Sequence, residues 1–156
     1  MTLKGIIDED FINYKKSSMT LMFPYCTFKC GGAGICQNSK LVNSKDIEID
    51  SYNICKRYLN NDITEAIVLQ GLEPFDSWDD LKELIIALRI HFNCFDDVVI
   101  YTGYNKNEIE EQIDWLSGFS NIIIKFGRYI PGQEKHFDEV LGVYLASDNQ
   151  YAERIT

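Results

Sequence analysis

The chain has 156 residues, 46% hydrophobic and 13% aromatic, which is enough to bury one core without disulfide bridges. We therefore expect a single domain spanning residues 1–156. The net charge of −9 argues against a general nucleic-acid-binding protein, because such proteins must neutralise phosphates. The odd number of five cysteines, with no signal-peptide pattern and no apolar run long enough for a membrane span, favours a cytoplasmic protein without a membrane partner.

One segment departs from this acidic average. Residues 14–45 contain five lysines and no Asp or Glu, so they carry +5 and the rest of the chain carries −14. Such a block is compatible with an ordinary solvated surface. It can also offset an anionic thiolate cluster or attract an acidic partner. The lysines are Lys15, Lys16, Lys29, Lys40 and Lys45.

Strands and helices are predicted to alternate along the chain. Apolar, β-rich segments at 18–23, 65–69, 97–102 and 121–126 are bounded by polar or glycine residues, as strands are. Helical patterns at about 50–59, 77–92 and 105–116 fall between them, each with a capping residue at its start. A last strand is expected at 140–146, followed by a short helical tail. This order predicts right-handed βαβ units and an α/β fold with a mostly parallel sheet.

The chemically informative segments each follow a predicted strand. A cysteine loop at 26–36 follows the first strand, and residues 70–74, 103–105 and 127–129 follow the next three. Because the carboxyl ends of parallel strands gather on one rim, these four loops are expected to form one site.

The cysteine loop is the strongest chemical signal in the sequence. Cys26, Cys30 and Cys36 lie within eleven residues, in a segment that also holds Gly31, Gly32 and Gly34. Thiolates select iron–sulfur clusters or zinc over harder cations, and glycines let a loop pass close to a cluster. Three thiolates also leave one iron of a cubane cluster open.

Zinc is the chemical rival at this loop. A structural zinc site needs a fourth ligand, and the remaining candidates are distant in the sequence: His91, His136, Cys55 and Cys94. We therefore favour an iron–sulfur cluster. Cys55 and Cys94 are expected to be buried as small apolar residues.

The order of the loops resembles the radical S-adenosylmethionine superfamily. The resemblance rests on the cysteine loop after the first core strand and on Gly71-Leu72-Glu73-Pro74 after the next. The short length, Tyr101-Thr102-Gly103-Tyr104 and Ser147-Asp148-Asn149-Gln150 look like the glycyl-radical enzyme activases, most similar to that of anaerobic ribonucleotide reductase. The resemblance runs from about Leu21 to Ile155.

This resemblance implies an incomplete parallel (β/α) barrel of the short radical-SAM type. It implies a [4Fe–4S] cluster on Cys26, Cys30 and Cys36, whose open iron is chelated by the amino and carboxylate groups of S-adenosyl-L-methionine. Reductive cleavage then gives methionine and a 5′-deoxyadenosyl radical. The radical removes a hydrogen atom from a glycine of a partner, expected to be anaerobic ribonucleotide reductase or another glycyl-radical enzyme.

The resemblance also implies which residues bind the cofactor, and it gives no residue of this chain an acid–base role. Gly71 and Glu73 seat the methionine end, while Tyr101, Gly103 and Tyr104 border the adenosine. The tyrosines can instead simply pack at the rim. Lys125 and Arg128 follow the fourth strand, where a basic group can pair with the cofactor carboxylate, although exposed positive side chains are commoner. From the charge pattern, an acidic flavodoxin or ferredoxin is expected to deliver the electron near Lys29 and Lys40.

The chain departs from the family pattern at two positions. The usual Cys-x3-Cys-x2-Cys spacing would place the third ligand at Ala33, yet the next cysteine is Cys36. Either a wider, glycine-rich loop brings Cys36 to the same place, which we favour, or the site is altered and makes no radical. Leu72 stands where the family commonly has glycine. The alternative functions are a radical enzyme acting on a peptide or small molecule and a non-catalytic iron–sulfur protein.

Overall fold

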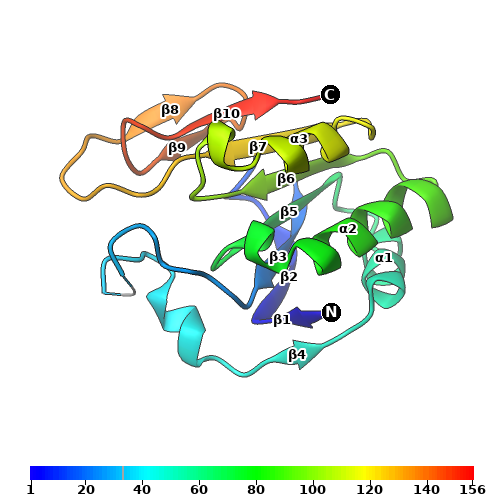
Figure 1. Ribbon diagram of the computed structural model, residues 1–156. Helices are drawn as coiled ribbons and strands as arrows, with labels where there is room; N and C mark the ends of the chain where they lie inside the picture. Colours follow the sequence, from blue (N-terminus) through cyan, green and yellow to red (C-terminus); the bar gives the residue numbers. More distant parts are fainter. Residues whose placement is uncertain (33) are drawn as a thin grey trace.

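The computed structural model describes residues 1–32 and 34–156, and a six-stranded mixed sheet lies at its centre (Figure 1). The strand order is β10-β7-β6-β5-β3-β2. The four inner strands are parallel: β3 (Ser18–Phe23), β5 (Ala66–Gly71), β6 (Asp97–Tyr101) and β7 (Ile122–Phe126). The outer strands β2 (Gly5–Asp10) and β10 (Tyr151–Arg154) pair antiparallel with their neighbours.

Helices and two short strand pairs surround this sheet. The α-helices are α1 (Ser51–Leu59), α2 (Trp78–Ile86) and α3 (Glu110–Leu116). Single turns of other helix types are η1 (Ser39–Asn43), η2 (Pro74–Ser77), η3 (Ala87–His91) and η4 (Lys106–Glu108). The antiparallel pairs are β1 (Thr2–Leu3) with β4 (Ile47–Glu48), and β8 (His136–Asp138) with β9 (Val143–Leu145).

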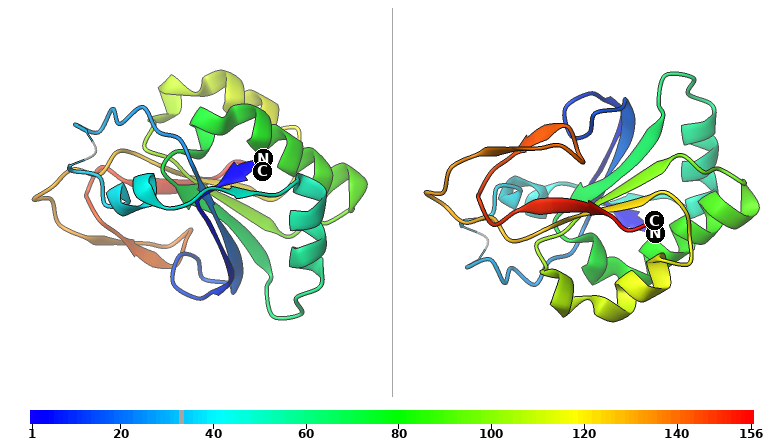
Figure 2. Two further views of the ribbon diagram at one scale, coloured as in Figure 1. Left: turned by 90° about the horizontal axis from the view of Figure 1, so that it is seen from below. Right: turned by 90° about the horizontal axis from the view of Figure 1, so that it is seen from above.

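The sheet is covered on both faces, which explains why its parallel strands are nearly all apolar. Successive side chains of a strand point to opposite faces, so Ile67 and Leu69 pack in the core under the helices. Their neighbour Val68 packs in the second core with Leu141 and Leu145, on the face that the β8–β9 pair covers (Figure 2).

The structure confirms the α/β class and the parallel core. Every predicted core strand appears within two residues of its expected bounds. A barrel is not shown: the described sheet is open, with β10 and β2 as its two edges. The single-domain organisation stays a prediction. In the described part of the chain, no helix combines the length and apolar content that crossing a membrane requires.

The predicted end of the chain is partly wrong. The expected helical tail is strand β10, which pairs antiparallel with β7 from Tyr151 to Arg154 and in which only Ala152 is buried. Pairing with β7 satisfies its backbone groups and overrides the local helical pattern. The strand expected at 140–146 is shorter and belongs to a hairpin with β8 that the sequence did not indicate.

A buried ion cluster at the amino end of β6 joins this strand to the segment before β3 and to the last residue of β10. The Asp97 carboxylate, 4% exposed, accepts hydrogen bonds from Lys16 Nζ at 2.6 Å, Tyr14 OH at 3.0 Å and Arg154 Nη2 at 3.0 Å. Burial alone would raise the pKa of Asp97, but the donors from Lys16, Arg154 and Tyr14 outweigh it and the pKa falls below its usual value.

We expect Asp97→Asn to lower the free energy of unfolding by about 2 kcal/mol at neutral pH, less than for a fully buried pair because both cations are partly exposed. The folded pKa of Asp97 lies below the unfolded one, so this contribution is complete above about pH 4 and disappears as pH falls through the folded pKa. Urea unfolding from pH 3 to 7 measures this free energy.

The matched control is Asp8→Asn, which breaks an exposed pair with Arg57. It should lower the free energy of unfolding by less than about 1 kcal/mol. Equal losses for both variants would contradict the prediction.

Candidate functional site

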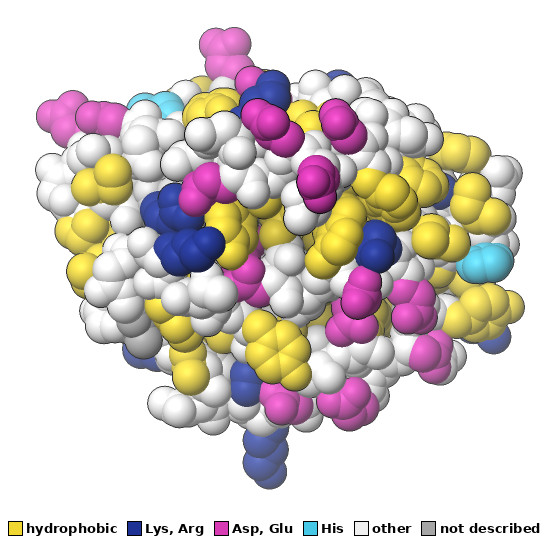
Figure 3. Space-filling model, viewed as in Figure 1, with side chains coloured by type: hydrophobic (Ala, Val, Ile, Leu, Met, Phe, Trp, Pro, Cys, Tyr) yellow, Lys and Arg dark blue, Asp and Glu magenta, His cyan; other side chains and the backbone are white. Residues whose placement is uncertain are grey.

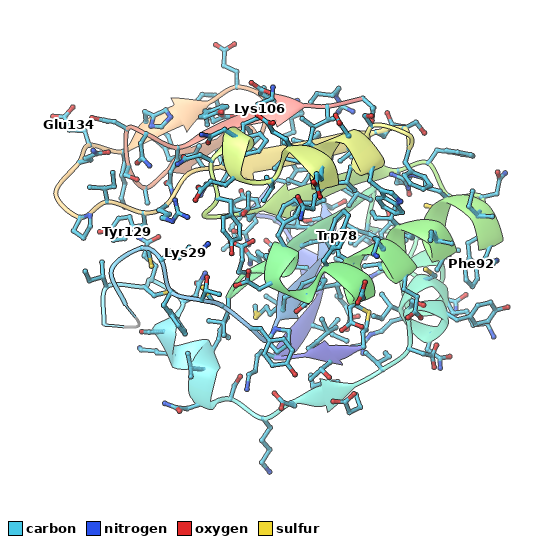
Figure 4. The ribbon with its side chains drawn as sticks, viewed as in Figure 1. Lys29, Trp78, Phe92, Lys106, Tyr129 and Glu134 are labelled. Atoms are coloured by element: carbon cyan, nitrogen blue, oxygen red, sulfur yellow. The ribbon has the colours of Figure 1, made fainter. Side chains whose placement is uncertain are left out.

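Loops from all four parallel strands meet at one cavity at the carboxyl end of the sheet. The cysteine loop after β3 supplies one wall, and the loops after β5, β6 and β7 supply the others. Lys29, on the cysteine loop, and Tyr129, after β7, both line this cavity and are labelled in Figure 4. Of the predicted site residues, the cavity gathers Cys26, Cys30, Cys36, Glu73, Gly103 and Tyr104. The single rim expected from the sequence is therefore present.

The three predicted cysteine ligands are half-buried free thiols in this cavity. Phe28 adopts a left-handed conformation with φ of 52°, and its carbonyl accepts the N–H groups of Gly31 and Gly32, which turns the chain tightly around Cys30. Burial raises the pKa of Cys26 to about 11, and the nearby charges of Glu73, Asp76 and Cys30 add to the rise.

The thiols share a cavity but are not gathered as a ligand set. Among the described residues, no three His, Cys, Asp or Glu side chains lie close enough to hold a metal ion. The donor set nevertheless fits an iron–sulfur cluster, because three thiols line one cavity. A Cβ added to Gly32 or Gly34 would meet nothing within 4 Å, so there is room around this loop. The convergence of the sulfurs stays a prediction, and Ala33 lies outside the described residues.

Glu73 connects the loops after β5 and β6. It is 4% exposed, and Oε1 accepts from Thr102 Oγ1 at 2.8 Å and Phe75 N at 3.2 Å, while Oε2 accepts from Gly103 N at 2.8 Å. Burial raises the pKa of Glu73 to about 7 against the lowering effect of these donors. A carboxylate has about four acceptor positions, so this one retains capacity for a further donor from the cavity.

Gly71 lies beside the cavity rather than among its lining residues. Its φ is +110°, and a Cβ there would stand 2.6 Å from the backbone nitrogen of Phe23, so only glycine fits against the end of β3. Its carbonyl accepts from Asn38 Nδ2 at 2.9 Å, which ties the far end of the cysteine loop to β5. Gly71 therefore closely contacts a neighbouring strand, and its expected place at the methionine end of the cofactor stays a prediction.

Lys125 is buried, unlike the exposed side chain that is common for lysine. It is 7% exposed on β7, and Nζ donates to Gly127 O at 2.9 Å. Burial lowers the pKa of Lys125 to about 8, and the Glu73 carboxylate opposes this. Among the described residues no carboxylate forms a salt bridge with it, so an ammonium with two unused N–H groups faces the cavity.

The two predicted adenosine-side tyrosines lie in different places. Tyr104 lines the cysteine cavity, where its hydroxyl donates to Asp76 Oδ1 at 2.6 Å. Tyr101 donates to Asn13 O at 2.6 Å and lines a second cavity. This second cavity shares Gln37, Lys125 and Gln150 with the first and is rich in carboxamide groups: Asn13, Gln37, Asn38, Gln70 and Gln150.

The late segment 147–150 supports the exit of β7. Gln150 is 5% exposed, and its Oε1 accepts from the backbone N–H groups of Ala146 and Ser147 while its Nε2 donates to Gly127 O at 3.2 Å. Asn149 Nδ2 donates to Arg128 O at 2.7 Å. These amides fix the loop that carries Arg128 to the cavity.

Comparison with models of known protein families shows the family to which the chain belongs. A family model described as a 4Fe-4S single cluster domain matches residues 16–149, which include the three cysteines and all four strand-exit loops. The chain belongs to this 4Fe-4S single cluster family. No curated protein and no solved structure matches the chain. Membership supports a [4Fe–4S] cluster, and its attachment to the cysteine loop stays a prediction.

The lysines of the basic segment of this 4Fe-4S family member do not form one surface. Lys16 pairs with Asp97 at the opposite end of the sheet, and Lys15 packs beside Gly142. Lys29 instead lies over the Tyr104 ring, 5.0 Å from its centroid. A small basic patch is visible on the left of the face in Figure 3, among mostly acidic charged side chains. The cavity therefore has a local positive border on an acidic protein.

Two contributors were missed by sequence reasoning. Asp76 accepts hydrogen bonds from the cysteine loop and from Tyr104, and Glu108 holds Arg128 by two bonds of 2.8 Å. Asp76 follows the Gly-x-Glu-Pro segment by two residues, which is the one sequence signal that could have indicated it. Nothing in the sequence pairs Glu108 with Arg128, because the two lie on different strand exits.

Proposed function

We propose that this chain holds a [4Fe–4S] cluster on Cys26, Cys30 and Cys36 and uses it to cleave S-adenosyl-L-methionine reductively. The bound cluster would supply one electron to the sulfonium, giving methionine and a 5′-deoxyadenosyl radical. The observation that carries the proposal is the placement of three thiols, a buried carboxylate and a buried ammonium around one cavity, in a member of the 4Fe-4S single cluster family.

The two buried charges fit the amino-acid end of the cofactor. Glu73 can accept a charge-assisted hydrogen bond from an α-ammonium group, and Lys125 can donate two to an α-carboxylate. Each is expensive to bury without a charged partner, so a zwitterionic ligand would relieve both penalties. Gly103 and Tyr104 border the same cavity and are proposed to face the adenosine.

The proposed target is a glycine of a partner glycyl-radical enzyme, such as anaerobic ribonucleotide reductase. The second cavity joins the first through Lys125 and Gln150, and the carboxamides of Gln37 and Gln70 in it can both donate to and accept from a peptide backbone. The same chemistry would serve a radical enzyme that acts on a free peptide or a small polar molecule.

A non-catalytic iron–sulfur protein is the competing proposal. The observation that favours it is the Cys-x3-Cys-x5-Cys spacing, together with thiols that share a cavity without forming a ligand set in the described residues. In that case the cluster would bind and change redox state, but S-adenosyl-L-methionine would stay intact.

The deciding experiment is anaerobic. The chain is reconstituted with iron and sulfide, reduced with dithionite in the presence of S-adenosyl-L-methionine, and analysed by chromatography. We expect 5′-deoxyadenosine and methionine in equal amounts. A reduced cluster that yields no 5′-deoxyadenosine would reject the enzymatic proposal. Adding a glycyl-radical reductase and recording its electron paramagnetic resonance (EPR) spectrum then tests the target.

The electron is proposed to come from an acidic flavodoxin or ferredoxin that docks near Lys29 and the exposed Lys40. We expect neutralisation of both lysines to glutamine to slow cluster reduction by such a donor several-fold at low salt, and much less at high salt where these charges are screened. Stopped-flow reduction rates measure this. Lys56→Gln on α1, away from the cavity, is the control. A rate that does not change at low salt would contradict docking at this border.

A further inference from the structure

The half-buried carboxylate of Asp76 joins two loops of the cavity. Asp76 lies in η2, the turn that directly follows Glu73. Its Oδ2 accepts from the backbone N–H of Thr27 at 2.8 Å, and its Oδ1 accepts from Tyr104 OH at 2.6 Å. Thr27 is the residue after Cys26. One side chain therefore connects the first cysteine, on the loop after β3, with the tyrosine on the loop after β6.

Further bonds continue this connection to Glu73. Tyr104 N donates to Thr102 Oγ1 at 3.0 Å, and Thr102 Oγ1 donates to Glu73 Oε1 at 2.8 Å. The cations of Lys29 and Arg128 lie 5.0 and 5.5 Å from the centre of the Tyr104 ring. Tyr104 is thus held by hydrogen bonds at its hydroxyl and its backbone N–H and by two cations near its ring. Asp76 is the group that links it to the cysteine loop.

We propose that Asp76 is a positioning residue that holds the backbone at Cys26 in place for the cluster and keeps Tyr104 in fixed relation to it. The alternative, a turn residue with a local role only, would need partners within η2. Both side-chain partners instead lie far along the chain, at positions 27 and 104. The carboxylate also acts electrostatically on Cys26, so its charge is close enough to affect a cluster bound there.

Two substitutions separate the two effects. Asp76→Ala removes both acceptors, so the Thr27 amide should exchange with deuterium at least about tenfold faster in the cluster-free chain, and iron bound per chain after reconstitution should fall. Asp76→Asn keeps a carbonyl for Thr27 and removes the charge. It should retain most amide protection and iron, while the midpoint potential of the cluster becomes less negative, because less negative charge opposes its reduction.

Asp79→Asn is the matched control, because Asp79 lies on α2 close by, its side chain is 94% exposed, and its partner is Lys82. It should leave amide exchange, iron content and potential unchanged. The proposal is overturned if Thr27 exchanges equally fast in Asp76→Ala and Asp79→Asn, or if iron content and potential agree in all variants. The measurements of iron content and midpoint potential rest on the proposed function, whereas amide exchange in the cluster-free chain does not. A wild-type chain that takes up no iron would therefore count against the proposed function, and the exchange rates of Thr27 would still test whether Asp76 holds the cysteine loop.

Discussion

Cys36→Ala is expected to reduce the iron and sulfide retained after anaerobic reconstitution to a small fraction of the wild-type amount. Cys36 lines the cavity with Cys26 and Cys30, and a cubane cluster held by only two thiolates loses a third of its protein bonds. The reduced variant should therefore show almost none of the EPR signal of a [4Fe–4S]⁺ cluster. Iron and sulfide assays with EPR of the dithionite-reduced protein measure the effect.

The controls come from the other two cysteines of the chain. Cys55 and Cys94 are buried in the core under the helices, as the sequence predicted, so Cys55→Ala and Cys94→Ala should lower stability slightly and keep a full cluster. If Cys36→Ala retains the same iron, sulfide and EPR signal as these controls, the third ligand is another group and the wider-loop interpretation is wrong.

The sequence predicted the parts of the site that depend on local pattern. Apolar runs such as 18–23 and 121–126 are buried on both faces, which gives a continuous hydrophobic signal that is easily read. Once these strands are placed, the rule that ligands bind at the carboxyl ends brings the cysteine loop, Glu73 and Tyr104 to one rim. The structure agrees with this placement.

The remaining features depend on contacts between distant segments. Lys125 is the clearest case: a lysine at the end of a strand is usually exposed, and its burial results from packing between the two cavities. Tyr101 and Tyr104 are three residues apart and looked equivalent, yet one bonds to Asn13 and the other to Asp76. No pattern in a single sequence predicts these hydrogen-bond partners, because each depends on where the loops lie in three dimensions.

Edge pairing is a second limit. Residues 151–154 are too few to show a clear helical or strand pattern of apolar residues. Their conformation results from pairing with the edge of β7. This strand then brings Arg154 to Asp97 and follows directly after the buried Gln150. Because the sequence predicted a helical tail here, it did not indicate the strand that follows Gln150 and pairs with β7 beside the site.

Glu73→Gln is expected to weaken the binding of S-adenosyl-L-methionine to the reconstituted protein by about 10- to 100-fold, since a charge-assisted hydrogen bond contributes roughly 1.5–3 kcal/mol. Yields of 5′-deoxyadenosine at low cofactor concentration should fall in parallel. Burial raises the pKa of Glu73 to about 7, so wild-type affinity should strengthen as pH rises through about 7 and the carboxylate ionises. The variant should lack this component of the pH dependence. Titration calorimetry under anaerobic conditions from pH 6 to 8 measures both effects.

Thr102→Val separates the charge of Glu73 from the hydrogen bonds that orient it. This substitution removes the hydroxyl that donates to Glu73 Oε1 and accepts from Tyr104 N, but the carboxylate keeps its charge and the donors from Phe75 and Gly103. Cofactor affinity should then stay within about threefold of wild type and keep its pH dependence, because the group that receives the ammonium is still present. If both variants lose affinity equally, or if Glu73→Gln binds as wild type does, Glu73 serves to connect the loops after β5 and β6 and does not contact the cofactor.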